Sequence, residues 1–241
     1  GSRKAPLIGK VVGVGLVDEI SDSTWVVIDA VDGRAHYAEL GRLKAAEVPR
    51  RDTVVALAGG GLRGKPSSVA RIQELSPVDV AEQVGYDGPT WLDQAIVSKW
   101  QPDPAMGGFA RDVHDALAAR SRWLVPRSLA TVSPAGAIDP VPDMMRTLRR
   151  SESERLAQEL SHVLGASYVA AEAGARIAGI YDRAITTPTG RIAVIRREDT
   201  FTLAPWRPAL EPFRGQAVTG TIGPRCVTWT LDRGRTLPGR T

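Results

Sequence analysis

The sequence predicts an α+β fold, with a small β-barrel, a helical middle segment and a second β-rich segment. Three observations predict it: short β-rich runs separated by turns at the start, apolar residues at helical spacing in the middle, and short alternating strands at the end. We therefore expect three domains, over residues 1–77, 78–165 and 166–241. The 43% hydrophobic and 24% charged content is typical of a folded protein and excludes wholesale disorder.

The first segment holds five short β-rich runs, and five such strands predict a small barrel of the OB or SH3 kind. Asp32-Gly33 indicates a hairpin turn between the second and third runs. The run Gly59–Pro66 resembles a phosphate-binding loop, but Pro66 stands where a Mg²⁺-binding hydroxyl is needed, so we expect a hairpin loop and no nucleotide site. The expected strands are Val11–Val14, Trp25–Ile28, Ala35–Tyr37, Thr53–Leu57 and Val69–Ile72.

The middle segment changes to a helical period. Thr90 and Asp93 form a capping box that opens a short helix, and Phe109, Val113 and Leu117 mark a second helix that ends near residue 123. We then expect a short helix over 124–130, a two-stranded wing over 131–138, a helix from Asp139-Pro140 to Arg150, and a further helix after a capping box at Ser151–Glu154, ending at Gly165. This order is winged-helix-like, a shape often used on DNA.

The last segment predicts short strands over 177–181, 191–195, 201–203, 218–222 and 227–231, with a turn at Thr189-Gly190. The net charge of +4 is concentrated here, since residues 173–241 carry 11 arginines and 5 acidic residues. A basic segment with interspersed tryptophan is a reasonable footprint for nucleic acid, although a GC-rich genome also favours arginine.

The sequence contains no convincing catalytic constellation. His36, His114 and His162 lie in three different segments, and the one cysteine excludes a disulfide framework and a cysteine-rich zinc site. We expect no enzyme activity in this chain, no metal and no cofactor. The apolar stretches are too short to span a bilayer, so we expect a cytoplasmic protein without membrane insertion. Gly1-Ser2 is typical of the remnant of a cleaved purification tag, which predicts a fragment of a longer protein.

Several sequence runs, taken in their order along the chain, resemble the C-terminal, non-catalytic region of conjugative relaxases, the plasmid mobilisation nucleases that nick an origin of transfer. The most specific run is Phe201–Glu211 (FTLAPWRPALE). The others are Gly9–Leu16, Ile28–His36, Gly88–Asp93, Gly179–Arg183, Gly190–Val194, Gly215–Gly220 and Val227–Trp229. In that family the nuclease, with its catalytic tyrosine and histidine-rich metal site, lies upstream of this region. The resemblance therefore implies a role in plasmid mobilisation and assigns no catalytic residue to this chain.

The resemblance leaves two leading functions open. One is a module that binds origin-of-transfer DNA or the transferred single strand within the relaxosome. The other is a protein-interaction module, a translocation signal recognised by the coupling protein of a type IV secretion channel, which would export the protein with the DNA into a recipient cell.

The candidate DNA-binding residues are the arginines and tryptophans of the last segment. The arginines either line a phosphate track or solvate a sheet face, and the tryptophans either stack on bases or join two segments by packing. Trp91 has the same two interpretations. The candidates are Arg176, Arg183, Arg191, Arg196, Arg197, Trp206, Arg207, Trp229, Arg233 and Arg235.

Overall fold

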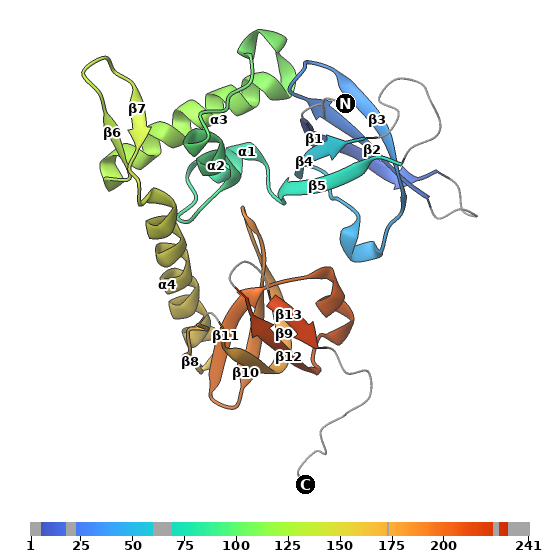
Figure 1. Ribbon diagram of the computed structural model, residues 1–241, viewed down its shortest axis with the longest axis vertical. Coiled ribbons are helices and arrows are strands. Elements are labelled where there is room, and N and C mark those ends of the chain that lie inside the picture. The colour runs from blue at the N-terminus through green and yellow to red at the C-terminus, as the bar shows by residue number, and fades with distance from the viewer. Residues whose placement is uncertain (1–5, 18–22, 60–68, 173, 224–226, 231–241) are drawn as a thin grey trace. The chain divides into compact units, whose positions relative to one another are not determined.

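The computed structural model describes residues 6–17, 23–59, 69–172, 174–223 and 227–230 (Figure 1). The chain divides into two units, Gly1–Glu152 and Ser153–Thr241, and each has its own sheet and its own hydrophobic core. We call them the N-terminal and the C-terminal unit. Helices accompany antiparallel sheets, so the predicted α+β class is confirmed. The division into three domains stays a prediction.

The N-terminal unit begins with a five-stranded antiparallel sheet in the order β3-β2-β1-β4-β5. Asp32-Gly33 lies in the turn between β2 and β3, where Gly33 has a φ of +76°, as the hairpin prediction requires. A short 3₁₀ helix, η1 (Ala45–Glu47), separates β3 from β4. The strands are β1 (Leu7–Leu16), β2 (Ser23–Ala30), β3 (Ala35–Arg42), β4 (Val54–Ala58) and β5 (Arg71–Ser76).

One face of this sheet carries the first core, in which Val26, Ile28 and Ala30 of β2 alternate with outward residues. Strands β3 and β5 end the strand order, and no ladder joins them within the described residues. One backbone hydrogen bond, from Ala70 N to Glu39 O at 3.0 Å, links β3 to the segment before β5. A closed barrel is therefore not found among these residues. Residues 60–68, which hold most of the glycine-rich loop considered above, lie outside the described part.

The helical part of the N-terminal unit confirms two predicted helices. Thr90 Oγ1 accepts a hydrogen bond from Asp93 N at 3.2 Å, and Asp93 Oδ2 accepts one from Thr90 N at 2.8 Å, so the predicted capping box opens α2. The elements are α1 (Val80–Val84), α2 (Trp91–Val97), η2 (Pro104–Met106), α3 (Gly108–Leu124), η3 (Val125–Arg127), β6 (Ala130–Val132) and β7 (Ile138–Pro140). Helix α4 (Met144–Leu164) follows and contains the boundary between the two units, after Glu152.

Three predictions in this region are wrong. The helix expected over 124–130 is only the 3₁₀ turn η3, because Ser128 adopts a left-handed φ of +58° that ends it. Asp139-Pro140 does not open a helix but belongs to β7. Pro140 lies opposite Ala130 of β6. Strands β6 and β7 pair as the two-stranded hairpin predicted as a wing. Helix α4 is continuous through Ser151–Glu154 and ends at Leu164, directly before Gly165. The winged-helix arrangement stays a prediction.

The C-terminal unit contains a six-stranded sheet in the order β13-β12-β9-β10-β11-β8, and the predicted strands of the last segment are present. All its pairs are antiparallel except that of β8 with β11. The elements are β8 (Ser167–Tyr168), β9 (Arg176–Thr187), β10 (Gly190–Arg197), β11 (Thr200–Pro205), the 3₁₀ helix η4 (Pro208–Phe213), β12 (Ala217–Ile222) and β13 (Val227–Thr230).

Both faces of this second sheet bury apolar side chains. Tyr181 and Ile195 pack with Leu210 and Phe213 of η4 on one side. Val194 packs with Phe201, Ala166 and Leu160 of α4 on the other side. Within the described part of the chain, no helix is both long and apolar enough to cross a membrane.

Candidate nucleic-acid interface

A polar cluster in the C-terminal unit joins the sequence runs around Tyr181 and Trp206. Trp206 Nε1 donates a hydrogen bond to Tyr181 Oη at 2.9 Å, and Tyr181 Oη donates a longer one to Glu211 Oε2 at 3.5 Å. Burial raises the pKa of the Tyr181 phenol above its ordinary value of 10.0, and the nearby Glu211 carboxylate acts in the same direction. Tyr181 therefore stays protonated at neutral pH and holds the Trp206 ring in place.

Arg191 lies over the ring that Tyr181 holds. Its guanidinium carbon is 4.6 Å from the Trp206 ring centroid, and Trp206 N donates to Arg191 O at 3.0 Å, so the backbone keeps the two side chains together. Such a cation–π contact stabilises by about 0.5–1 kcal/mol at an exposed position. Among the described residues, no carboxylate lies within 4.0 Å of the Arg191 guanidinium. Its N–H edge can therefore donate to an oxyanion while its face stays on the ring.

Arg207 follows Trp206 directly and is exposed at the start of η4. It has no ion-pair partner among the described residues. Arg191, Trp206 and Arg207 thus form one group, which we call the Arg191–Trp206 cluster.

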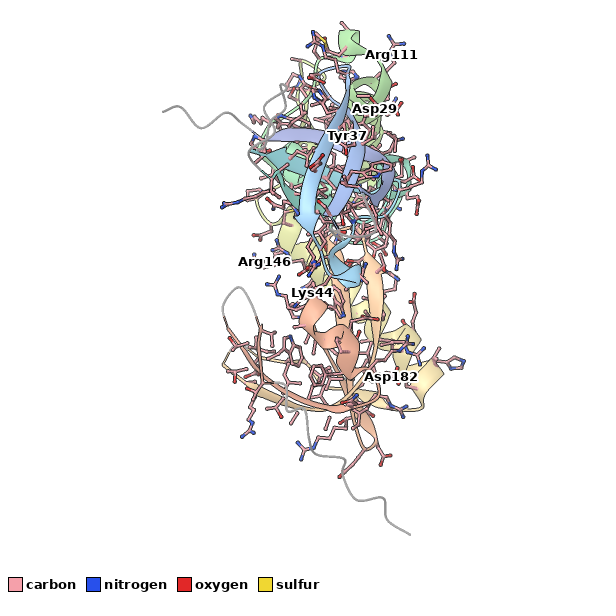
Figure 2. All side chains as sticks on the ribbon, turned by 90° about the vertical axis from the view of Figure 1, so that its right-hand side faces the viewer. Asp29, Tyr37, Lys44, Arg111, Arg146 and Asp182 are labelled. Atoms are coloured by element: carbon pink, nitrogen blue, oxygen red, sulfur yellow. The ribbon has the colours of Figure 1, made fainter. Side chains whose placement is uncertain are left out.

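Arg183 and Arg196 are arranged differently, because both face the carboxylate of Asp182, the residue labelled in Figure 2. Asp182 lies where the β9–β10 register shifts, between the pairs Val194–Arg183 and Ile195–Tyr181. Arg183 Nε is 2.5 Å from Asp182 Oδ2, and Arg196 Nη1 is 4.0 Å from Asp182 Oδ1. A phosphate that binds here must compete with this carboxylate.

Arg176 and Arg197 line an open groove of about 530 Å³ near the turn between β10 and β11. Glu198 and Asp199 line the same groove, so its charge is mixed. This mixture gives the groove no clear preference for an anion.

Trp229 has a packing role. A Cβ atom on Gly220 would lie 2.8 Å from Trp229 Cε3, so the glycine makes room for the ring against the core of the unit. Trp229 Nε1 is buried and has no hydrogen-bond partner among the described residues. Trp91 is likewise buried, in the N-terminal unit, with its ring centroid 5.7 Å from that of Trp100. Its buried ring packs in the core, so base stacking by Trp91 is not supported.

Comparison with protein-family models gives a match to a family described as a protein of unknown function (DUF3363), over residues 1–68 and 62–238. The chain belongs to the DUF3363 family. No curated protein and no solved structure matches it. The relaxase resemblance stays a prediction.

In this DUF3363 chain, the described candidate residues fall into separate groups by their contacts. The structure brings together Arg191, Trp206 and Arg207 at one place and Arg183 and Arg196 at another, with Arg176 and Arg197 at the groove. Arg233 and Arg235 lie outside the described residues. Within the described part of the chain, no group of three or more His, Cys, Asp or Glu side chains is placed to hold a metal ion.

Sequence reasoning missed four residues of these contacts. Glu211 accepts from Tyr181, and Arg214 Nε donates to Asp182 O at 3.2 Å. Tyr181 and Asp182 lie in the run Gly179–Arg183 and Glu211 ends the run Phe201–Glu211, so taking every polar residue of the two runs would have found these three; Arg214 follows three residues later. The sequence gives no other signal, because Asp182 and Arg214 meet only through the fold.

Proposed function

We propose that this chain is the accessory C-terminal part of a conjugative relaxase and holds origin-of-transfer DNA or the transferred strand through its C-terminal unit. The observation that carries the proposal is the stacking of Arg191 on Trp206, with the donor edge of the guanidinium unpaired. The resemblance of the surrounding runs to relaxases supplies the biological context. The finer fold predictions, an OB or SH3 barrel and a winged-helix middle, belong to the same proposal.

The ordered guanidinium gives the proposed contact its strength. A phosphate accepts two parallel hydrogen bonds from a planar guanidinium, and a ring that already orders the arginine lowers the entropy lost on binding. Arg207, the next residue after Trp206 along the chain, adds a second positive charge. Each phosphate that these arginines neutralise releases a counterion, so the affinity should fall steeply with salt.

The Asp182 group contributes less in this proposal. To bind DNA, Arg183 and Arg196 must leave the Asp182 carboxylate for a phosphate. The free energy gained on binding is then only the difference between two similar ionic interactions. Variants of Arg191 should therefore affect DNA affinity more than variants of Arg183.

The test is a fluorescence-anisotropy titration of the full chain with labelled oligothymidylate and a labelled mixed-sequence duplex, at about 50 and 200 mM salt. Arg191→Ala should weaken binding by about tenfold, as for loss of a charge-assisted hydrogen bond, and should lower the salt slope by about one. Arg71→Ala, at an exposed arginine of β5 in the other unit, is the matched control. Absence of binding at low salt, or an equal loss in both variants, contradicts the proposal.

A second candidate function, the translocation signal read by a coupling protein, is favoured by exposed apolar side chains in the same unit. Val163 near the end of α4 is 66% exposed, and Val169 after β8 is 49% exposed. Replacing both by serine should reduce transfer of a reporter fused to the chain through a type IV channel while DNA affinity stays unchanged. Unchanged transfer excludes these two valines from such a signal.

A further inference from the structure

The outward face of the first sheet carries an aromatic pair that no part of the proposed DNA function uses. Trp25 of β2 and Tyr37 of β3 lie side by side, with ring centroids 6.1 Å apart and planes inclined by 25°. Tyr37 is 54% exposed. Its side chain is labelled in Figure 2. Trp25 alternates with Thr24 and Val26, which point to the buried face, so both rings belong to the opposite face of the sheet.

Two glycines of β1 hold the Trp25 ring close to the sheet. A Cβ atom on Gly13 would lie 3.3 Å from Trp25 Cζ3, and one on Gly15 would lie 2.8 Å from Cζ2. The six-membered part of the indole therefore covers both glycine positions and lies across β1. Trp25 Nε1 donates to Leu16 O at 3.0 Å, which fixes the ring in this position. The outer side of the ring faces away from the strand.

The rest of this face divides into a covered end and an open end. At the covered end, Asp29 Oδ2 accepts a hydrogen bond from Phe109 N at 3.2 Å, which brings the start of α3 onto the sheet. At the open end, Tyr37 lies opposite Val27 and Glu39 lies opposite Trp25, so both side chains share the face of the Trp25 ring. We call Trp25 and Tyr37 the aromatic platform.

The stretch of sequence that carries the platform is rich in acidic residues, in contrast with the chain as a whole. Residues 7–42 contain six acidic and three basic residues, whereas the chain has a net charge of +4. Three of the acids are in residues 18–22, which lie outside the described part. Burial and the nearby Glu39 carboxylate both raise the pKa of the Tyr37 phenol, so the charge of Glu39 stands beside the exposed ring.

The basic residues of these strands are already engaged. Lys10 Nζ is 3.2 Å from Asp79 Oδ2, and Arg42 has an interaction partner of its own. Arg34 lies beyond the platform, in the turn that leads into β3.

We propose that the aromatic platform binds an extended segment of a partner protein through an arginine or lysine side chain placed over the Trp25–Tyr37 rings and beside Glu39. A cation is attracted by the face of an aromatic ring and by a carboxylate at the same time. Aromatic-lined surfaces also accept extended, proline-rich segments, which lose little entropy on binding. Nucleic acid fits less well, because its phosphates would approach the Glu39 carboxylate.

This inference does not depend on the proposed DNA role, since it concerns residues of the other unit. A cationic peptide is also repelled by the overall positive charge of the chain, so its binding would report the attraction of Glu39 and the two rings. The two proposals can therefore fail separately.

The experiment uses the full chain and three labelled probes: a short peptide of alternating arginine and proline, the same peptide with glutamine in place of arginine, and oligothymidylate. Tyr37→Ala and Glu39→Gln should each weaken binding of the arginine peptide by about two- to fivefold, as expected for an exposed cation–π contact and an exposed ion pair. Tyr37→Phe keeps the ring and should retain most of the affinity. Glu82→Gln, at an exposed acid of α1, is the matched control for the loss of charge.

A second readout follows the indole N–H resonances of the ¹⁵N-labelled chain, with Trp25 assigned through Trp25→Phe. The arginine peptide should shift the Trp25 resonance and leave that of Trp206 unchanged. The proposal is overturned if the arginine peptide does not bind, if Tyr37→Ala binds it as well as the unchanged chain, or if Glu82→Gln loses as much affinity as Glu39→Gln. It is also overturned if oligothymidylate binds and Tyr37→Ala removes that binding, because the platform would then stack on bases.

Discussion

Asp93 and Arg120 form a bidentate ion pair in which both side chains are fully buried. Nε of Arg120 is 2.8 Å from Oδ1 of Asp93, and Nη2 is 2.9 Å from Oδ2. The remaining donors reach the carbonyl oxygens of Tyr86 and Gly88, at 2.7 and 2.8 Å. One arginine of α3 thereby fixes the loop before α2, including part of the run Gly88–Asp93.

Replacing Arg120 with methionine should destabilise the N-terminal unit strongly, by about 3–5 kcal/mol, because Asp93 then keeps a buried charge without its partner. Urea unfolding followed by tryptophan fluorescence measures this change. Arg122→Met, at an exposed position of the same helix, is the control and should stay within about 0.5 kcal/mol. Similar losses of unfolding free energy in the two variants would contradict a stabilising role for the Asp93–Arg120 ion pair. Adding Asp93→Leu to Arg120→Met should recover part of the stability, since it removes the buried, unpaired carboxylate of Asp93.

Thr90→Ala should lower the unfolding free energy of the same unit by about 1 kcal/mol, because the N-cap acceptor of α2 is lost. The cost has a second source, since Thr90 Oγ1 also donates to Asp93 Oδ2 at 2.9 Å. Thr90→Ser keeps the hydroxyl and should remain close to the original stability. Equal unfolding midpoints for the alanine and serine variants would show that the cap contributes nothing.

Gly9→Ala should destabilise the first sheet. The added Cβ would lie 2.7 Å from the backbone oxygen of Asp29 and 2.8 Å from Ile28 Cδ1, so the strands must separate. The expected cost is about 1–3 kcal/mol, as for other overpacked positions. Gly85→Ala is the matched control, since nothing lies within 4 Å of its added Cβ and its φ is −96°. Thermal unfolding of the two variants compares them directly.

The stability of the C-terminal unit should fall in alkaline solution. Burial raises the pKa of Tyr181, and that of Tyr168, above the ordinary value of 10.0. The folded unit then holds its phenol protons more tightly than the unfolded chain. This stabilisation is complete below pH 10.0 and is lost as the pH rises through the folded pKa.

The measurement is the unfolding midpoint at several pH values above 9, together with the tyrosinate difference absorbance. Tyr181→Phe should have a lower midpoint at neutral pH, because Trp206 Nε1 loses its acceptor, and a weaker alkaline decline. An unchanged alkaline decline in Tyr181→Phe would contradict the burial of this phenol.

Local patterns predicted the local structure of this chain well. Asp32-Gly33 specifies its turn through the positive φ that glycine allows, and Thr90 with Asp93 specifies a helix start through two reciprocal hydrogen bonds. The errors have the same local origin. Pro140 is typical of a first helical turn, but the edge of a two-stranded hairpin also tolerates its missing N–H group.

The candidate site was harder to predict, because it depends on register. A run of arginines along β10 gives no information on which residues meet across strands. The register shift between Val194 and Ile195 places Asp182 between Arg183 and Arg196, and the pairing of Asp93 with Arg120 spans two helices. The aromatic platform was missed for a similar reason, since Trp25 and Tyr37 become neighbours only when β2 pairs with β3.

The glycines beneath Trp25 also predict which residues relatives of this chain should retain together. Any β-carbon at position 15 would collide with the indole at 2.8 Å, so a lineage that exchanges this glycine must move or lose the ring. Glycine at positions 13 and 15 and tryptophan at position 25 should therefore be inherited as a set. Relatives that have lost one member should have lost the others, together with whatever the ring recognises.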